Sequence, residues 1–261
     1  MGSKIIMDSD ILREIIEYSI YAPSGDNSQP WQFKIKENKI FVYNVPEKDT
    51  SLYNFLMSAS LISIGALVEN IKIASSYYGY RCEVSLDEDI SSNLVALCTL
   101  IKDNEILQSD LFKYIKERKT NRKPYKKEKL SSDFINEAEK IRTLYADEYS
   151  TVDFKIQNKV EAIDNIAFVS SLNEQIVLEN KALHDFLFSH ITWTEEEDKQ
   201  KKGFFIKTLE IKGFKKFIFK ILKSWKVLSI LNKVSISKLV SRDNAKIYSH
   251  SGAMLSIVTD N

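Results

Sequence analysis

The sequence is short of the residues that interrupt or cross-link a chain. Its 261 residues include seven glycines, four prolines, two cysteines and three histidines. So little glycine and proline excludes collagen-like and low-complexity proteins, and two cysteines cannot build the disulfide framework of a small secreted domain. Because Cys82 and Cys98 stand in apolar, strand-like runs, we expect buried packing thiols rather than a disulfide or a metal site. This predicts a reducing, cytoplasmic compartment.

An excess of charge of either sign is also missing. Lysine and arginine total 37 against 36 acidic residues, which leaves a formal net charge of +1. The charge of the whole chain therefore selects neither nucleic acid nor an acidic partner. The first residues show no apolar core of a signal peptide, and Ile6 stands where a myristoylation signal needs Ser or Thr.

One uncharged run approaches the length of a membrane span. Residues 51–68 contain no charged side chain. Polar residues nevertheless recur within the run, at Ser51, Asn54, Ser58, Ser60 and Ser63. We therefore expect a buried helix of a globular protein rather than a span.

Motifs for catalysis by the protein itself are scarce. No G-x-G-x-x-G or Walker loop occurs between a strand and a helix, which argues against a doubly wound dinucleotide-binding domain. His184, His190 and His250 have neither metal-ligand spacing nor a Cys or Ser partner pattern, so we interpret them as core or surface residues. The acidic run 195–198 is interpreted as a solvated loop. We predict no metal ligand and no catalytic side chain.

Hydrophobic periodicity predicts an α+β protein in which helices and strands alternate. The first helix should start at a cap among residues 8–10 and end before Pro23, and Gly79 should close the second in a left-handed conformation. The remaining helices are expected over 52–78, 109–117, 131–145 and 163–188, and the strands over 31–35, 40–43, 80–86, 94–101, 152–156 and 253–258.

The loop after the first helix, Ala22 to Phe33, reads APSGDNSQPWQF. It presents backbone N–H groups, the Ser24 hydroxyl and the amides of Asn27 and Gln29 at the end of an element, and Gly25 allows close backbone approach. Such a loop can lie against a planar, hydrogen-bonding ligand. Alternatively, it is a capped turn whose side chains satisfy its own backbone. Trp31 is expected to anchor the strand that follows.

A second motif, Arg118 to Tyr125, reads RKTNRKPY. If the segment is extended, Arg118, Thr120 and Arg122 can converge on one phosphate, because guanidinium matches phosphate oxygens in a bidentate manner. The alternative is a solvated basic stretch, since five further lysines crowd the motif: Lys116, Lys119, Lys123, Lys126 and Lys127.

The loop APSGDNSQPWQF resembles the loop after the first helix of the FMN-dependent nitroreductase family, in which a Pro-Ser, an Asn and a Gln-Pro-Trp followed by an aromatic recur. Residues 64–71 and 78–80 resemble the long central helix of that family and the turn after it, so the likeness covers residues 10–86. The resemblance implies a nitroreductase-like α+β fold, with a central mixed or antiparallel sheet flanked by helices.

The second motif supports the same family. R-x-T-x-R resembles the R-x-S-x-R that binds the FMN phosphate, and the longer R-x-T-N-R-x-P-aromatic is similar to the Acg-like subgroup, which carries two nitroreductase-like halves in one chain. The resemblance therefore implies halves at 1–105 and 106–261, which would form an intramolecular pseudo-dimer or a homodimer. It assigns FMN contacts to Pro23, Ser24, Gly25, Asn27, Gln29, Arg118, Thr120, Asn121 and Arg122.

The family implies that bound FMN carries the chemistry. Hydride would pass from NAD(P)H through the flavin to a nitroaromatic or quinone acceptor. An FMN-binding or sequestering protein with little or no reductase activity is the alternative, and an interaction module that binds no flavin is a third. Family members continue past a strand like residues 256–261 into a helix and a tail, so we expect a chain shortened there.

A basic segment has no counterpart in the motifs above. Ten lysines face a single acidic residue, Glu210, between Lys199 and Lys226, amid many aromatic and aliphatic residues. We interpret residues 195–240 as a lid-like insertion, as the Acg-like subgroup has. Membrane contact through 199–226 is the less favoured alternative.

Overall fold

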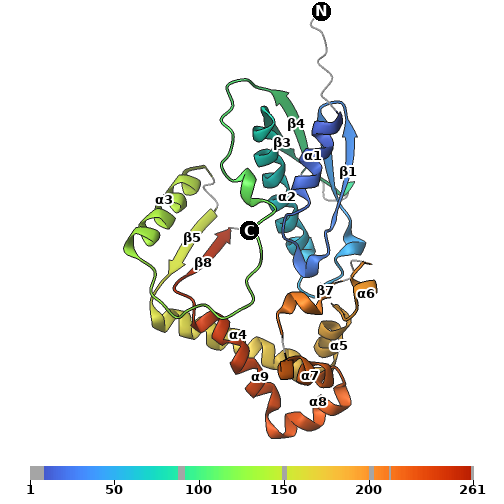
Figure 1. Cartoon of the computed structure of the whole chain (residues 1–261), viewed down its shortest axis with the longest axis vertical. Coiled ribbons are helices and arrows are strands. Elements are labelled where there is room, and N and C mark those ends of the chain that lie inside the picture. Colours follow the sequence, from blue (N-terminus) through green and yellow to red (C-terminus); the bar gives the residue numbers. More distant parts are fainter. Residues whose placement is uncertain (1–8, 88–91, 149–151, 200–202, 212, 260–261) are drawn as a thin grey trace, which may run out of the picture. The chain divides into compact units, whose positions relative to one another are not determined.

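The computed structural model of the chain describes residues 9–87, 92–148, 152–199, 203–211 and 213–259 (Figure 1). It is a mixed α+β structure with small antiparallel sheets, as the sequence predicts at this level. Two compact units divide the chain, one of residues 1–120 with 192–205 and one of residues 121–191 with 206–261. The expected tandem halves with a first half of 1–105 stay a prediction.

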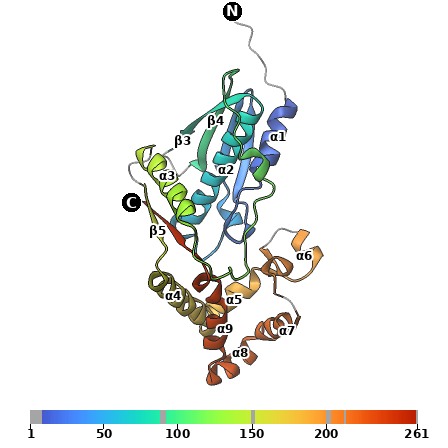
Figure 2. The same ribbon diagram turned by 60° about the vertical axis from the view of Figure 1, so that its left-hand side comes forward.

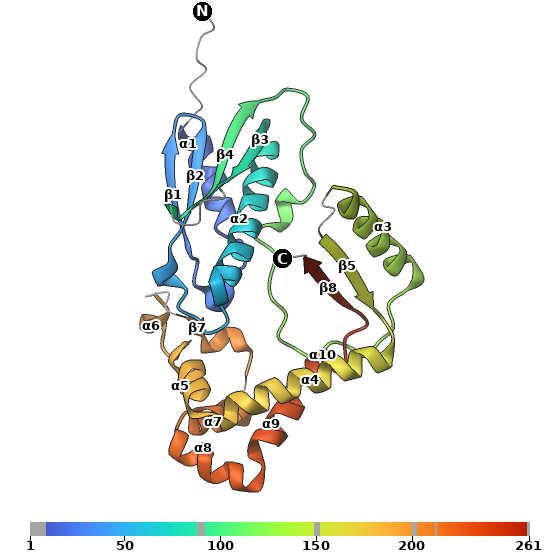
Figure 3. The same cartoon turned by 180° about the vertical axis from the view of Figure 1, so that it is seen from behind.

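The first unit contains a four-stranded sheet in the order β1-β2-β4-β3 (Figure 3). Each pair of neighbours is antiparallel, so the sheet has the antiparallel rather than the mixed form of the expected architecture. The four strands are β1 (Trp31–Lys36), β2 (Lys39–Asn44), β3 (Tyr80–Leu86) and β4 (Leu94–Lys102). All four fall where the alternating pattern predicts them, including the hairpin turn between β1 and β2.

Helices α1 (Ser9–Ser19) and α2 (Ser58–Tyr77) cover one face of this sheet, toward the viewer in Figure 1 and behind the sheet in Figure 3. Alternate residues of the central strands point toward the helices, because successive side chains of a strand face opposite sides. The core therefore joins Ile15 of α1 and Leu67 and Ile71 of α2 to Ile40 and Leu100 of the sheet. Covering one face only is usual for an antiparallel sheet.

Helix α2 begins later than the periodicity predicts. The expected start was near residue 52, but the helix starts at Ser58 after a short 3-10 turn. Leu56 and Met57 adopt left-handed backbone angles, with φ of 50° and 61°, and this conformation interrupts the helix. Gly79 has a φ of 76°, which confirms the left-handed residue expected at the other end.

Among the described residues, one helical stretch, Phe55–Tyr77, has the length and apolar composition to cross a membrane. It contains α2, whose Ile64, Leu67 and Ile71 are buried in the core of the first unit. A core helix passes the same test of length and composition as a membrane span, and 28% of the apolar window is buried, so the core helix stays a prediction.

The prediction of a helix over 109–117 is wrong. Only the 3-10 turn η5 (Phe112–Tyr114) forms there. The Phe112 ring stacks on Tyr77 with a centroid distance of 3.8 Å and an interplanar angle of 7°. Gln108 donates to the Tyr77 carbonyl and the Ser109 amide donates to Ser76 Oγ. Contacts with the end of α2 thus hold the segment in addition to its own turn hydrogen bonds, such as that from the Arg118 amide to the Tyr114 carbonyl.

The two cysteines are free and lie in adjacent strands, and Cys98 is buried as predicted whereas Cys82 is half-buried. Cys98 pairs with Val84 and Leu100 with Cys82, so the thiols are diagonal neighbours across β3 and β4. The contact with Cys98, together with burial, raises the pKa of the Cys82 thiol. Fifteen intervening residues conceal this proximity in the sequence.

The second unit contains a two-stranded antiparallel sheet of β5 (Val152–Gln157) and β8 (Met254–Thr259), with α3 (Ser132–Glu148) beside it (Figure 3). Its other helices gather around α4 (Figure 2), which contacts α5, α9 and α10. These are α4 (Val160–Glu179), α5 (Lys181–Ser189), α7 (Gly213–Leu222), α8 (Trp225–Leu231), α9 (Ile236–Asn244) and α10 (Lys246–Ser249).

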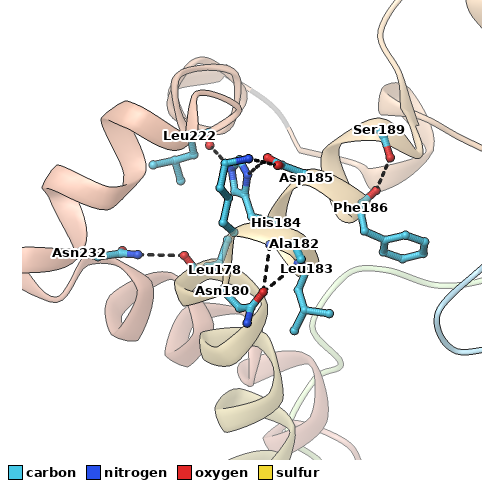
Figure 4. A network of polar contacts seen from close by, with 11 residues as sticks. Leu178, Asn180, Ala182, Leu183, His184, Asp185, Phe186, Ser189, Leu222 and Asn232 are labelled. Atoms are coloured by element: carbon cyan, nitrogen blue, oxygen red, sulfur yellow. Dashed lines mark hydrogen bonds and ion pairs between the residues drawn. The ribbon is translucent and has the colours of Figure 1, made fainter.

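The predicted single helix over 163–188 is two helices. Asn180 separates α4 from α5 with an extended backbone at φ −104° and ψ 122°. Its Oδ1 accepts hydrogen bonds from the amides of Ala182 and Leu183, at 3.0 and 3.2 Å (Figure 4). An Asn side chain satisfies the first free N–H groups of a helix in this way, so Asn180 ends one helix and caps the next.

The lysine-rich region is built from short elements. From Ile191 to Leu209 the described residues form the strand pair β6 (Ile191–Thr192) and β7 (Phe204–Phe205), the turn η6 (Ile206–Leu209) and α6 (Glu195–Lys199). The acidic run 195–198 is therefore helical and not the expected loop. Helix α7 follows, with Phe214 and Phe217 exposed and Leu222 buried. The lid-like role expected of residues 195–240 stays a prediction.

Candidate functional site

The candidate site begins where α1 ends. The backbone N–H of Asn27 donates to the Ser24 carbonyl at 3.2 Å, and the backbone N–H of Ser28 donates to the Gly25 carbonyl at 2.8 Å. The Ser24 hydroxyl accepts a further hydrogen bond from the Gln29 amide at 3.0 Å. The loop therefore satisfies part of its own backbone, as the alternative of a capped turn requires. Its side chains are not all used in this way.

Three residues of the loop have left-handed backbone angles. The φ angles are 50° at Asp26, 55° at Asn27 and 47° at Gln29. Asp and Asn adopt this conformation more readily than other residues with a Cβ, and Gln has no such advantage. Residues held in such regions cluster at ligand-binding and catalytic sites, where surrounding contacts fix them. The sequence indicated a tight loop but not these angles.

Contacts from the first hairpin fix the loop. The Lys48 ammonium donates to the carbonyls of Gln29 and Trp31, at 3.4 and 3.1 Å, and the Val45 amide donates to the Pro30 carbonyl at 3.0 Å. The Trp31 side chain is 4% exposed, which confirms the expected anchor of β1. Lys48 was not singled out from the sequence, because it carries no motif of its own.

A buried polar cluster lies beneath Gly25. A Cβ added to Gly25 would lie 3.6 Å from Asp49 Oδ2 and 3.9 Å from the Ala59 Cβ. Asp49 is 6% exposed and its Oδ2 accepts from Ser60 Oγ at 3.4 Å. Asn54 donates to the Asp49 carbonyl and to Ser60 Oγ, each at 2.9 Å. This cluster supports the loop from below, and Gly25 itself stays exposed.

One polar atom of the loop has no partner. Ser28 Oγ is buried and makes no hydrogen bond within the part of the chain that the structure describes. By contrast, the side chains of Ser24 and Gln29 are partly exposed, and those of Pro23 and Asn27 are exposed. The loop thus offers an exposed amide and a partly exposed hydroxyl within a few residues of each other.

Two cations reach the start of the loop from the far end of the first unit. Arg118 Nη2 donates to the Tyr21 carbonyl at 3.4 Å, although 97 residues separate the two in the sequence. The Lys116 ammonium lies 3.9 Å from the centre of the Tyr18 ring. A cation over an aromatic face is held by the charge distribution of the ring. Of the expected phosphate ligands, Arg118 is therefore at the loop, with Lys116 as an additional cation.

The rest of the second motif is divided between the two units. Thr120 is an exposed residue of the first unit, while Asn121 and Arg122 belong to the second unit. The Asn121 side chain donates to the Lys123 carbonyl and accepts from the Lys123 amide, each at 3.1 Å. Asn121 thus shapes its own turn. The convergence of Arg118, Thr120 and Arg122 on one phosphate stays a prediction.

The contacts of His184 indicate a structural role. His184 is 1% exposed, and its Nε2 lies 2.9 Å from the Leu222 carbonyl (Figure 4), which can only accept a hydrogen bond. The ring contacts Phe188 and Trp225. This confirms His184 as a core residue that ties α5 to the end of α7. In the described parts of the chain, no three His, Cys, Asp or Glu side chains form a group that could hold a metal ion.

Comparison with known proteins adds one distant relative. No family model matches the chain. A protein of Mycobacterium tuberculosis (strain CDC 1551 / Oshkosh) named Uncharacterized protein MT1398 is 22% identical over 255 residues, which cover 94% of this chain. The chain spans about a third of that relative, 34% of its length. The chain is therefore similar to part of a longer protein whose name states no activity.

Proposed function

We propose that the protein is an FMN-binding flavoprotein of the nitroreductase type, in which hydride passes from NAD(P)H through the flavin to a nitroaromatic or quinone acceptor. The observation that carries the proposal is the loop after α1, with left-handed Asp26, Asn27 and Gln29 held rigidly beside Arg118. The resemblance of this loop to the family supports the choice of FMN. The fold-family assignment is part of the same proposal.

The loop residues fit one edge of a flavin. An isoalloxazine ring has both donors and acceptors at its pyrimidine edge, and the exposed Asn27 amide can match either kind. The Ser24 hydroxyl, which accepts from Gln29, still has a proton to donate. Gly25 is exposed and has no side chain that would hinder close approach of a ring. These groups would orient the ring without forming a covalent bond to it.

The cations at the loop entrance fit the phosphate of FMN. The Tyr21 carbonyl takes one of the five N–H donors of Arg118. A guanidinium with donors to spare can bind phosphate oxygens in pairs, and Lys116 adds a second positive charge nearby. Both charges are on exposed side chains, so salt should weaken their contribution.

The chemistry of the proposed reaction belongs to the cofactor: when bound, FMN supplies the hydride exchange between NAD(P)H and the acceptor. The chain's own residues bind and orient. The Asn27 amide and Ser24 hydroxyl would fix the ring edge, and Arg118 would hold the phosphate. Because the loop is held by Lys48 and by the buried Asp49 cluster, these groups are positioned before the ligand arrives.

The test is a visible absorption spectrum of the full chain after incubation with FMN and desalting, followed by anaerobic addition of NADPH. We expect flavin bands that are retained and then bleach. Bands that are retained but do not bleach would support the sequestering protein instead. A colourless protein would overturn the proposal.

Variants separate specific FMN binding from nonspecific flavin uptake. Arg118→Ala removes charge-assisted hydrogen bonds, each worth about 1.5 to 3 kcal/mol, so FMN should bind roughly ten- to hundredfold more weakly. Arg13→Ala is the matched control, since Arg13 is an exposed residue of α1 that pairs with Asp10 at 3.9 Å. Equal losses in the two variants would exclude Arg118 as a phosphate ligand.

A further inference from the structure

A pocket of about 530 Å³ lies in the first unit, apart from the loop. It is at one end of the inner face of the sheet, where β2 and β3 end and β4 and α2 begin. Its walls include Asn44, Met57, Gly65, Leu86 and Ala96. The volume is in the range of small-molecule sites, about 300 to 1,000 Å³.

The pocket runs from the surface into the core. Leu86 and Gly65 at its rim are exposed, whereas Ile64 and Ala96 at its base are buried. The wall is mainly aliphatic, and of the described lining residues only Asp87 carries a charge. A negatively charged ligand is therefore disfavoured, and an apolar one would remove much hydrocarbon surface from water.

One polar atom in the wall has no partner. Asn44 is 4% exposed, and its Nδ2 lies 3.2 Å from Met57 Sδ. A thioether sulfur can only accept, so this contact identifies the amino side of the amide and leaves Oδ1 on the other side. Oδ1 is buried and has no hydrogen-bond partner among the described residues. A buried acceptor without a donor is costly, and a ligand that donates a hydrogen bond would remove that cost once the Asn44 side chain turns to expose Oδ1 to the pocket.

The backbone next to the pocket is strained. Met57 lines the pocket, and both it and Leu56 have left-handed angles at the start of α2. Two successive residues with a Cβ rarely adopt this conformation, which elsewhere accompanies ligand clamps. The Met57 sulfur, at this strained turn, lies against the Asn44 amide.

We propose that this pocket is a second small-molecule site, which binds a neutral, largely aromatic molecule carrying one hydroxyl or amino donor. The donor would bind Asn44 Oδ1, and the ring would lie between Val68 and Leu86. None of residues 23–29, nor Arg118, lines the pocket. The proposal therefore does not rest on flavin binding at the loop.

The test uses the full chain without flavin and two probes of the same shape, 2-naphthol and naphthalene. Only 2-naphthol has a donor. Titration followed by calorimetry or probe fluorescence should give an affinity for 2-naphthol roughly tenfold higher than for naphthalene, as expected for one hydrogen bond in a dry pocket. Equal affinities, or no binding of either probe, would overturn the proposal.

Gly65 allows a variant that fills the pocket without disturbing the fold. A Cβ added there meets no atom within 4 Å, and glycine is a poor residue for the interior of a helix. Gly65→Leu should abolish binding of both probes and leave the melting temperature equal or higher. Gly65→Ala is the control, and it should bind both probes as the native chain does. Binding that survives in Gly65→Leu would place the probes elsewhere and overturn the assignment.

A second variant tests the acceptor. Asn44→Leu keeps a similar shape and removes Oδ1, so naphthalene should still bind and the advantage of 2-naphthol should fall to about twofold or less. An unchanged tenfold advantage would exclude Asn44. Competition with FMN separates the two proposals: if FMN displaces 2-naphthol, the pocket is part of the flavin site and the claim of a second site fails, whereas simultaneous binding supports it.

Discussion

At the scale of single residues, a substitution at Asn27 should change ligand binding without lowering stability. Its φ of 55° suits glycine better than asparagine, and its side chain is exposed. Asn27→Gly should therefore keep or raise the free energy of unfolding by up to about 1 kcal/mol while it removes the amide. FMN affinity should fall nonetheless. Denaturant titration and FMN titration of the same variant check both expectations, and unchanged FMN affinity would exclude the Asn27 contact.

Glu174 in α4 is a carboxyl whose surroundings disfavour its charge. Burial raises its pKa above the ordinary value of 4.5, the Asn244 side chain offsets part of this, and Oε2 has no partner among the described residues. A raised pKa in the folded state means that stability is fully present below the ordinary pKa and is lost as pH rises through the raised one. Charged Glu174 therefore destabilises the second unit at neutral pH.

Glu174→Gln removes that charge. The variant should unfold with a higher free energy than the native chain at about pH 7, by a few tenths to about 1 kcal/mol because the group is partly solvated, and the difference should vanish near pH 4. Urea unfolding at the two pH values measures it. Glu161→Gln, at the exposed start of the same helix, is the control and should show no such gain. A gain that is independent of pH would contradict the electrostatic explanation.

At the scale of elements, the sequence predicted strands and helix interiors better than helix ends. All four strands of the first sheet follow from alternation, because this pattern repeats the buried face of each strand. The start of α2 could not be predicted, since Leu56 and Met57 are ordinary helix residues whose left-handed angles come from surrounding contacts. The break at Asn180 did have a signal, because Asn is a preferred cap.

The candidate site shows the same division. The loop after α1 was indicated by its unusual composition, and Arg118 by its charge. Lys48 and the Asp49 cluster were missed, because they support the loop through contacts that the chain makes only after folding. The pocket beside Asn44 had no signal at all. It arises from four elements that meet in space, and most of its residues are aliphatic residues typical of a core.

The cap at Asn180 gives the prediction at this scale. Asn180→Ala removes the acceptor for the amides of Ala182 and Leu183, so the second unit should lose about 1 kcal/mol of stability, within a range of roughly 0.5 to 2. Ser189→Ala, at the exposed other end of α5, is the control, since its hydroxyl contacts only the Phe186 carbonyl and His190 Nδ1 and caps no helix start. Denaturant unfolding compares the two, and equal effects would mean that the cap contributes nothing special.

At the scale of the whole molecule, the chain crosses between the two compact units three times, after Thr120, after Ile191 and after Phe205. The chain passes from one unit to the other after Thr120, and residues 118–131 form no regular element. The later part of this segment is fixed within the second unit: a Cβ on Gly252 would lie 2.7 Å from the Glu128 carbonyl and 2.8 Å from the Leu130 Cγ. No atom of residues 119–127 is among the nearest neighbours of a Cβ placed on Gly25, Gly65, Gly79, Gly213 or Gly252.

Limited trypsin digestion tests this organisation. Proteases cut exposed backbone outside regular structure, so the first cuts should follow Lys119, Lys126 or Lys127, and not Lys123, which precedes Pro124. Gly252→Ala forces the Glu128 carbonyl away and should add an early cut after Lys129. Mass spectrometry of the first products identifies the sites. First cuts among the lysines of α7, or within residues 9–117, would contradict the expectation, because those segments would then open more readily than the connection between the units.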